Sequence, residues 1–322
     1  MILTRCKAFT LVELLVVIAI VGLLSTIVLA VTSGVSEQGR IAKGLQFSQH
    51  LENGLGAYLV GRWSFDEGTD NTCLDGKDAC DSSGWNNNGT FSGTSVWRCA
   101  SVNESYTPSG LGCSLEFGDS QYVDAGANIS LNPIDAITIS AWAKINSLAG
   151  HDTIASKTGG GGSWWWGGWF LSKYSDYGSI ETVFSDGVSK GVGFVSSTKM
   201  NVNQWHHIVV SYKGGTDGYL KLYQDGKNVS GYDSVTNSFY GTDITWNFGF
   251  PTSLFLSPSC FGIGGGCGRG SYPFSGFIDE VSAYNAALTT VQIEREYYVG
   301  LDNLLVKGLI NETEYQKRLV LN

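Results

Sequence analysis

The longest apolar stretch of the chain lies near its N-terminus, where most positions from Phe9 to Val31 are hydrophobic. About 20 apolar residues are enough for a helix to span a bilayer. The stretch contains one charged residue, Glu13. An acid at the centre of a membrane helix costs about 2.5–3.5 kcal/mol. The pattern therefore predicts a membrane helix in which Glu13 makes an interaction that compensates this cost.

The helical pattern continues beyond the apolar stretch. Apolar residues recur close to one helical face at Ile41, Leu45, Leu51, Leu55 and Tyr58. No proline occurs before Pro108. We therefore expect one helix over residues 9–58, roughly 75 Å long at 1.5 Å per residue.

Residues 1–8 are too short and too polar for an ordinary signal peptide, whose apolar core precedes the cleavage site. The segment from Lys7 to Glu13, Lys-Ala-Phe-Thr-Leu-Val-Glu, resembles the amino terminus of type IV pilins and pseudopilins. That resemblance implies cleavage between Ala8 and Phe9 by a prepilin peptidase, and N-methylation of Phe9. The family normally has Gly before the cut, and Ala8 is a minority variant. A plain membrane anchor with a basic cytoplasmic end is the alternative.

From Leu59 onward the pattern changes to short alternating segments separated by turns. The expected strands cover 59–68, 114–117, 121–124, 137–143, 204–212, 220–227 and 274–284. The pair Asp225-Gly226 is a strong hairpin signal. The 43 glycines and 12% aromatic residues are also typical of many short strands joined by tight turns.

Four segments in order resemble the landmarks of the laminin-G-like, concanavalin A-like jelly roll. They are residues 63–68 (Trp-Ser-Phe-Asp-Glu-Gly), 81–84 (Asp-Ser-Ser-Gly), 204–207 (Gln-Trp-His-His) and 276–281 (Gly-Phe-Ile-Asp-Glu-Val). The resemblance implies two packed antiparallel sheets. We call this domain the head, and its first strand should lie beside its last.

The expected fold class is α+β, with a long N-terminal helix, an antiparallel β-sandwich and a short C-terminal helical tail. The expected parts are a leader (1–8), a membrane and assembly helix (9–58), the sandwich (59–286) and the tail (287–322). Within the tail we expect a helix over 288–298 capped by Thr289 or Thr290. We then expect a small helical hairpin over 301–319.

The formal charge of −9 falls to about −11 once Arg5 and Lys7 leave with the leader. No basic patch remains outside the leader, which argues against a nucleic-acid partner. The balance fits an exported head, or one that binds cations.

Removal of Cys6 with the leader leaves an even number of cysteines. They form three pairs close in sequence: Cys73 with Cys80, Cys99 with Cys113, and Cys260 with Cys267. Such pairs are typical of disulfides in an oxidising compartment. A zinc site is the alternative, but no Cys-x-x-Cys spacing occurs and no histidine lies near them.

No catalytic constellation stands out, and we expect a protein that is not an enzyme. Glucanases of the same fold use two glutamates flanking an aspartate on one strand, and that motif does not occur here. Asp279 and Glu280 are adjacent on a strand, so alternation should put them on opposite faces. His206 and His207 should be separated in the same way and have structural roles.

Calcium is a better candidate than catalysis, because Ca²⁺ binds six to eight carboxylate, amide and backbone oxygens. Asp66, Asp81, Asn88 and Asp279 should converge if the first and last strands of the head are neighbours. The resemblance implies a Ca²⁺ near this place in many family members. The alternative is that these side chains only form turns and cap strand ends.

A second candidate site is the run Trp164-Trp165-Trp166 within a glycine-rich segment. Three consecutive tryptophans cannot all face one core from a strand, so at least one should be exposed. Exposed aromatic rings suit a carbohydrate or another protein. The alternative is that Trp169 and Phe170 belong to the core and the three tryptophans fold back over the sheet edge.

These features together predict a pilin-like subunit of a type IV pilus or pseudopilus, with a lectin-like head for adhesion. Glu13 would pair with the amino group of Phe9 on a neighbouring pilin subunit. We expect the chain in the cytoplasmic membrane before assembly and in an extracellular filament or at the cell surface afterwards. The large head favours a minor or tip subunit. The alternatives are a membrane-tethered carbohydrate-binding protein that never polymerises and a type II secretion pseudopilin.

Overall fold

The computed structural model describes residues 11, 14–16, 18, 54–94, 96–118, 120–158, 167–251, 261–265, 272–306, 310–313 and 315–316. The chain divides into two compact units, Met1–His50 and Leu51–Asn322. In the first unit the described positions are helical. Among the described helices, none has the length and apolar character needed to cross a bilayer. Ala8, Phe9 and Glu13 lie outside the described residues, so their predicted roles stay predictions.

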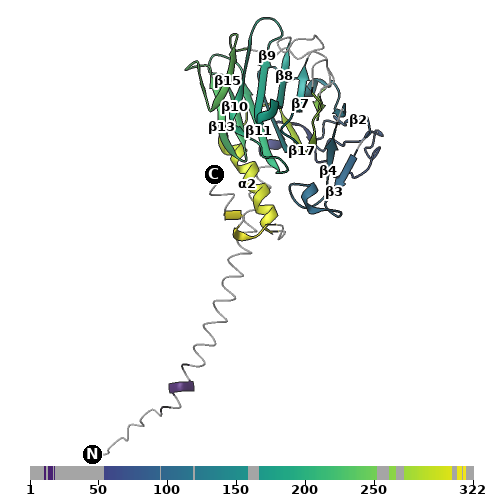
Figure 1. Cartoon of the computed structure of the whole chain (residues 1–322), viewed down its shortest axis with the longest axis vertical. Coiled ribbons are helices and arrows are strands. Elements are labelled where there is room, and N and C mark those ends of the chain that lie inside the picture. Colours follow the sequence, from purple (N-terminus) through teal and green to yellow (C-terminus); the bar gives the residue numbers. More distant parts are fainter. Residues whose placement is uncertain are drawn as a thin grey trace, which may run out of the picture. The chain divides into compact units, whose positions relative to one another are not determined.

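The second unit is a sandwich of two antiparallel sheets (Figure 1). The nine-stranded sheet has the order β14 (Ser238–Tyr240), β13 (Lys227–Asp233), β12 (Tyr219–Gln224), β11 (His206–Lys213), β6 (Ala136–Ile145), β17 (Gly276–Tyr284), β4 (Cys113–Phe117) and β3 (Val96–Cys99), with β1 (Leu59–Trp63) also paired to β17. The eight-stranded sheet has the order β15 (Thr242–Asn247), β10 (Gly191–Lys199), β9 (Ser179–Ser185), β8 (Gly168–Tyr174), β7 (Asp152–Thr158), β16 (Gly262–Ile263), β5 (Tyr122–Asp124) and β2 (Thr90–Ser92). Three short 3₁₀ helices, η1 (Glu104–Tyr106), η2 (Ile129–Leu131) and η3 (Ser175–Tyr177), join strands. The expected sandwich is confirmed.

The main core lies between the two sheets and follows the alternation of the strands. Phe184 of β9 stacks on Tyr212 of β11, with ring centroids 4.7 Å apart. Trp63 of β1 is fully buried and stacks on Phe261 at 5.2 Å. Each large side chain buried in this way contributes about 1.5–3 kcal/mol relative to an exposed one.

The ends of the sandwich meet as the resemblance implied. Strand β1 pairs antiparallel with β17, from Leu59 opposite Tyr284 to Trp63 opposite Val281. The hairpin between β12 and β13 turns at Asp225 and Gly226, whose φ angles are 52° and 82°. Both predictions are confirmed.

The C-terminal helix α2 (Thr290–Val306) covers part of the outer face of the nine-stranded sheet (Figure 1). Its residues Ile293, Tyr297 and Leu301 recur every four positions and are buried. Ile293 joins Val209 of β11 in a second hydrophobic cluster. This cluster also contains Leu55, so the residues just before β1 pack with the tail helix.

The start of α2 follows the expected capping pattern. Gln292 donates its backbone N–H to the Thr289 hydroxyl, and the Thr289 N–H donates to the Gln292 side chain at 2.8 Å. The predicted end of the first tail helix at residue 298 was wrong, because α2 runs to Val306. The predicted hairpin over 301–319 lies partly outside the described residues and stays a prediction. The helix continues past Gly300, because burial of Leu301 against Tyr297 offsets the roughly 1 kcal/mol that glycine costs in a helix. Residues 312–313 and 315–316 are also helical, and the Tyr315 N–H donates to the Asn311 carbonyl at 2.9 Å.

Candidate functional site

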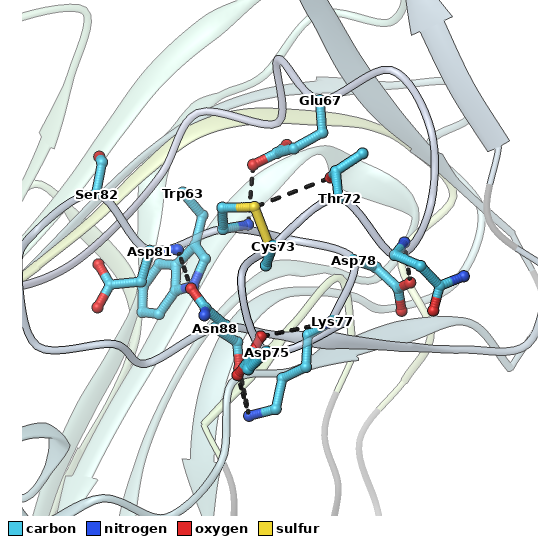
Figure 2. The surroundings of a disulfide bond; sticks show 12 residues. Trp63, Glu67, Thr72, Cys73, Asp75, Lys77, Asp78, Asp81, Ser82 and Asn88 are labelled. Atoms are coloured by element: carbon cyan, nitrogen blue, oxygen red, sulfur yellow. Dashed lines mark hydrogen bonds and ion pairs between the residues drawn. A yellow bond between two sulfur atoms is a disulfide. The ribbon is translucent and has the colours of Figure 1, made fainter.

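A disulfide closes the loop that follows β1. Cys73 and Cys80 are bonded, and the yellow bond at Cys73 in Figure 2 is this disulfide. A second disulfide joins Cys99 of β3 to Cys113 of β4. Both were predicted, and both are present. Cys260 and Cys267 lie outside the described residues, so the third pair stays a prediction.

The metal-binding alternative for the first pair does not fit the structure. The donor atoms of Glu67, Cys73 and Cys80 lie within 4.8 Å of one another. The two sulfur atoms are bonded to each other, however, and a disulfide leaves no thiolate to bind a metal. Cys73 and Cys80 therefore act as a clasp on the loop.

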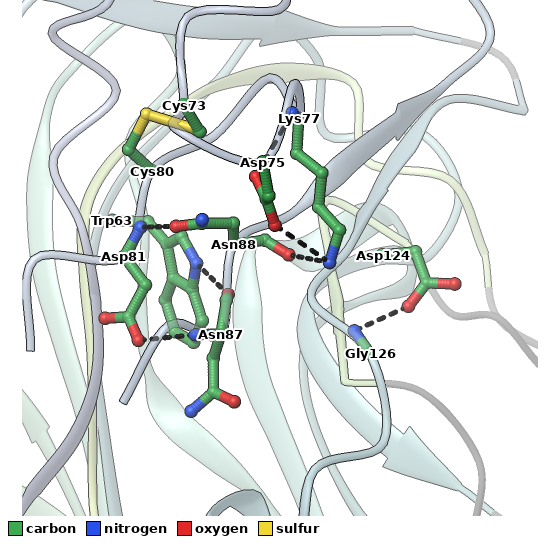
Figure 3. Close-up of polar contacts among 10 residues, drawn as sticks. All are labelled: Trp63, Cys73, Asp75, Lys77, Cys80, Asp81, Asn87, Asn88, Asp124 and Gly126. Carbon is green, nitrogen blue, oxygen red and sulfur yellow. Dashed lines mark hydrogen bonds and ion pairs between the residues drawn. A yellow bond between two sulfur atoms is a disulfide. The ribbon is translucent and has the colours of Figure 1, made fainter. Parts of the chain in front are cut away.

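Asp81 organises the turn after this clasp. Its Oδ1 accepts the backbone N–H groups of Arg62 at 2.9 Å and Ser83 at 2.8 Å. Its Oδ2 accepts the Ser83 hydroxyl at 2.8 Å. The same oxygen accepts the Asn87 N–H, also at 2.8 Å (Figure 3). Four donors thus surround the carboxylate, which is the arrangement expected for a turn-forming aspartate.

Asn88 and its neighbours extend the same network (Figure 3). The side-chain oxygen of Asn88 accepts the Asp81 N–H at 2.7 Å, and its carbonyl accepts the Lys77 ammonium at 3.0 Å. The indole N–H of the buried Trp63 donates to the Asn87 carbonyl at 2.9 Å. The loop is therefore fixed to the core strand β1, and the side chains of Asp81 and Asn88 hold its backbone in place through hydrogen bonds.

The other two predicted ligands, Asp66 and Asp279, lie close enough to each other to interact electrostatically. Asp66 follows β1 and accepts the Cys113 N–H on Oδ1 at 3.0 Å. Asp279 lies within β17 and is 3% exposed. Because β1 pairs with β17, the two carboxylates are close enough for the charge of Asp66 to help raise the pKa of Asp279.

A bulge in β17 brings a further acid to this place. The register between β17 and β6 shifts after Asp279, and Glu280 has a φ of 48°. The Glu280 N–H donates to Asp279 Oδ1 at 2.9 Å. Strict alternation therefore fails here, because a bulge adds one residue and bends the strand. Burial, and then the charge of Glu280, raises the pKa of Asp279 well above its usual range.

Glu67 completes an acidic cluster with Asp66, Asp279 and Glu280. Its Oε1 accepts the Cys80 N–H at 2.8 Å (Figure 2). Its Oε2 is buried and has no hydrogen-bond partner among the described residues. Burial also raises the pKa of this carboxyl. A buried oxygen without a partner and several carboxylates that repel one another fit a hard divalent cation.

Sequence reasoning missed Glu67 and Glu280 as members of this cluster. Glu67 directly follows Asp66 in the acidic turn, so a signal for it was present. Glu280 was excluded as a facing partner by strand alternation, and it is exposed whereas Asp279 is buried. Its charge nevertheless acts on Asp279.

The comparison with protein families decides the class of the head. Residues 117–294 match the model of the concanavalin A-like lectin/glucanases superfamily. The chain belongs to this superfamily. Residues 3–29 match the prokaryotic N-terminal methylation motif. The expected combination of a pilin-like N-terminus with a concanavalin A-like head is therefore confirmed.

Several solved structures are similar to the chain, although no curated protein matches it. Domain 4 of AbnA, a GH43 extracellular arabinanase from Geobacillus stearothermophilus solved in complex with arabinotriose, is 20% identical, with 74% of this chain and 97% of that chain covered and a TM-score of 0.46. The binding domain of Paraclostridial Mosquitocidal Protein 1 is 14% identical, with coverages of 77% and 53% and a TM-score of 0.48. The binding domain of botulinum neurotoxin DC, in complex with rat synaptotagmin II, is 13% identical, with coverages of 76% and 52% and a TM-score of 0.47. The chain thus spans about half the length of these two toxin structures.

The predicted ligand platform of the concanavalin A-like head, Trp164 to Trp166, lies outside the described residues. Its role stays a prediction. Of the two aromatic residues that follow, Trp169 is in the main core and stacks on Phe184. Phe170 is also buried but lies outside that core cluster.

The two adjacent histidines point to opposite faces of β11, as alternation predicted. His206 Nδ1 lies 2.7 Å from Asp225 Oδ2. His207 lies on the outer face, where its Nε2 is 2.8 Å from the Ser140 hydroxyl and its ring stacks on Tyr297 of α2. Both rings are buried, and burial lowers the pKa of His207 to about 4. These contacts account for both histidines as structural groups.

Proposed function

We propose that the chain is a pilin-like subunit that displays a concanavalin A-like head for adhesion. The observation that carries this proposal is the presence of the methylation motif and a lectin-like domain in one chain. The motif supports processing by a prepilin peptidase, with cleavage between Ala8 and Phe9 and methylation of Phe9. It also supports a location in the cytoplasmic membrane first, and at the cell surface or in an extracellular filament after assembly.

Glu13 has the central part in assembly under this proposal. A carboxylate within an apolar helix costs about 2.5–3.5 kcal/mol at the centre of a bilayer. The positive amino group of Phe9 on a neighbouring subunit would compensate that cost, because an opposite charge stabilises the ionised acid. A head of this size also favours a minor or tip subunit over the main subunit of a tightly packed filament.

The head would bind a carbohydrate or another cell-surface ligand, and we propose that it does so without catalysis. The superfamily includes both lectins and glucanases, so the proposal rests on the residues. The acids that the structure brings together, Asp66, Glu67, Asp279 and Glu280, fit a cation site as described above. Trp164 to Trp166 are the proposed contacts for the ligand.

Mass spectrometry of the mature chain tests the export route. We expect an N-terminal methyl-Phe9 and recovery of the chain in filaments sheared from cells. Glu13→Ala should abolish filament recovery and leave the head folded, whereas Glu37→Ala, outside the motif, should change neither. An unprocessed chain that stays in the membrane would contradict the proposal and favour the tethered carbohydrate-binding protein. A processed chain that forms no surface filament but is required for protein secretion would favour the pseudopilin.

We also propose that the acidic cluster binds Ca²⁺ through Asp66, Glu67 and Asp279. The buried, unpartnered Oε2 of Glu67 supports this choice within the described part of the chain. Asp81 and Asn88, the other two members of the predicted set, are engaged by the hydrogen bonds of the turn. Bound Ca²⁺ would neutralise the repulsion among the acids and fix β1 to the bulge of β17.

Titration calorimetry and thermal unfolding of the full chain, with Ca²⁺ or with a chelator, test this site. We expect heat of binding and a higher Tm with Ca²⁺, and loss of both in Asp279→Asn. The matched variant Asp81→Asn should lower the Tm equally with and without Ca²⁺, because it weakens only the turn. Absence of heat and of any Ca²⁺-dependent change in Tm would end the proposal.

The tryptophan platform can be tested separately. Replacing Trp164, Trp165 and Trp166 with Ala should reduce adhesion of cells or binding of glycans without lowering the Tm of the head. Unchanged adhesion in this variant would remove the three residues from the proposed ligand site.

A further inference from the structure

A buried acid with an unsatisfied oxygen lies on the outer face of the eight-stranded sheet. Ile180 and Phe184 of β9 belong to the main core, so Glu181 between them points away from it. The residue is only 5% exposed. Its Oε2 has no hydrogen-bond partner among the described residues. A buried polar atom without a partner costs roughly 1–3 kcal/mol, so such a position calls for an explanation.

The surroundings of Glu181 combine hydroxyl groups with aromatic rings. Ser172 lies directly opposite on β8, and its hydroxyl donates to Thr153 Oγ1 at 3.4 Å. The His151 ring has its Nδ1 3.7 Å from Glu181 Oε2. It also stacks on Tyr272 at 4.8 Å. This set of residues is here called the Glu181 cluster.

Within the Glu181 cluster, the side chains that reach solvent are those of His151 and Tyr272. The side chain of His151 is 26% exposed and Tyr272 is 39% exposed, whereas Ser172 and Thr153 are buried. A ligand that reaches Glu181 would therefore pass along the His151 and Tyr272 rings. Aromatic rings of this kind offer a flat apolar surface beside a polar group.

A buried ion pair holds this arrangement in place. Lys173 Nζ lies 2.6 Å from Asp152 Oδ2 and donates to the carbonyls of residues 148 and 149 at 2.8 and 2.9 Å. The Thr153 N–H donates to the Tyr272 carbonyl at 3.0 Å. These contacts connect the backbone around His151 to β8 and to the Tyr272 carbonyl. A backbone held in this way lowers the entropic cost of binding.

We propose that the Glu181 cluster is a binding subsite for a neutral carbohydrate ring. The apolar face of the ring would stack on Tyr272, and a hydroxyl would satisfy the buried carboxyl of Glu181. A cationic ligand is disfavoured, because His151 beside the carboxyl would repel it when protonated. An anionic ligand is disfavoured, because its charge would lose hydration beside the buried carboxyl and would be repelled once that carboxyl ionises.

The Glu181 cluster and the predicted tryptophan platform belong to different parts of the sequence. Trp164 to Trp166 belong to the segment that joins β7 to β8, beyond Thr158. His151 and Tyr174 lie at the opposite end of the same two strands. Seven residues of strand span roughly 23 Å at about 3.3 Å per residue. The inference rests on the proposed ligand-binding role of the head and adds a second place of contact.

An array of neutral oligosaccharides of hexose and pentose units, with sialylated and sulfated counterparts, tests the subsite on the full chain in detergent. We expect the wild-type chain to bind neutral members. Glu181→Leu, which removes the hydrogen bond, and Tyr272→Ala, which removes the ring, should each weaken binding at least about tenfold, the equivalent of one hydrogen bond. Tyr240→Ala is the matched control, because Tyr240 is also 39% exposed but lies on β14 of the other sheet. Thermal unfolding of each variant verifies that the head is folded.

The possible outcomes separate this inference from the broader proposal. Full binding by Glu181→Leu, or binding of charged members only, would overturn the subsite. Loss of binding in the tryptophan variant alone would overturn it too, and would leave the ligand-binding role of the head intact. Failure of the wild-type chain to bind any neutral member would overturn the subsite, while filament recovery would still test the pilin-like role.

Discussion

Replacing Glu181 with Gln should change how the stability of the head depends on pH. Burial raises the pKa of the Glu181 carboxyl from 4.5 to about 8, because the charged form loses its hydration. Since the pKa in the folded state lies above the unfolded value, the protonated carboxyl contributes to the stability of the fold, and this contribution is complete below about pH 4.5. It is lost as the pH rises through about 8. Glutamine keeps the shape of the side chain and does not ionise.

The size of the effect follows from the pKa difference. One pKa unit corresponds to about 1.36 kcal/mol, so the wild-type protein should lose roughly 2 kcal/mol between pH 6.5 and pH 9. That loss equals about 4–8 °C in Tm for a domain of this size. The buried Lys157, whose pKa is lowered to about 8, also titrates in this range. It is present in both proteins, so its contribution cancels in the comparison.

Scanning calorimetry of the wild-type chain and Glu181→Gln at both pH values measures this difference. We expect the wild-type Tm to fall more steeply with pH than that of the variant. Equal falls in the two proteins would refute the reasoning, since they would show that the Glu181 carboxyl is already ionised at pH 6.5.

Three further changes have expected sizes. Replacing Cys73 and Cys80 with Ser should cost about 2.5 kcal/mol in thermal unfolding, from the entropy of the short loop that the disulfide closes. Thr289→Ala should cost about 1 kcal/mol in urea unfolding, because it removes the cap of α2 and the partner of Gln292. Because the pKa of His207 is lowered to about 4, the neutral ring stabilises the fold above about pH 6.5, and this stabilisation is lost as the pH falls through about 4. His207→Phe should therefore remove a loss of about 3 kcal/mol in the free energy of unfolding at acid pH. If the stability of His207→Phe falls at acid pH as much as that of the wild-type chain, this assignment is contradicted.

Local sequence signals predicted much of the head correctly. The Asp225-Gly226 pair marked the hairpin between β12 and β13, because both positions need a positive φ. Thr289 marked the start of α2 through its cap. The family landmarks at either end of the head predicted that β1 pairs with β17. The hairpin and the helix cap depend on residues that are close in sequence. The pairing of β1 with β17 is a feature of the fold that the family landmarks identify.

The acidic cluster shows where such signals end. The sequence grouped Asp81 and Asn88 with Asp66 and Asp279, because all four are oxygen donors in nearby loops and strands. In the structure, Asp81 and Asn88 are engaged by the hydrogen bonds of the turn that follows the Cys73–Cys80 disulfide. Glu280 joins Asp279 through a bulge, and one extra residue in a strand leaves no clear mark in an alternating pattern.

Alternation also cannot tell whether the outer face of a sheet is covered. Glu181 and His207 both occupy outward positions on their strands, where a polar residue suggests contact with water. Both are buried in the structure, and for His207 the cover is Tyr297 of α2. The two groups titrate in opposite senses, because burial raises the pKa of the acid and lowers that of the histidine. Protonation of the buried His207 therefore weakens the fold at acid pH, and ionisation of the buried Glu181 weakens it at basic pH. The fold is most stable between these two pH ranges.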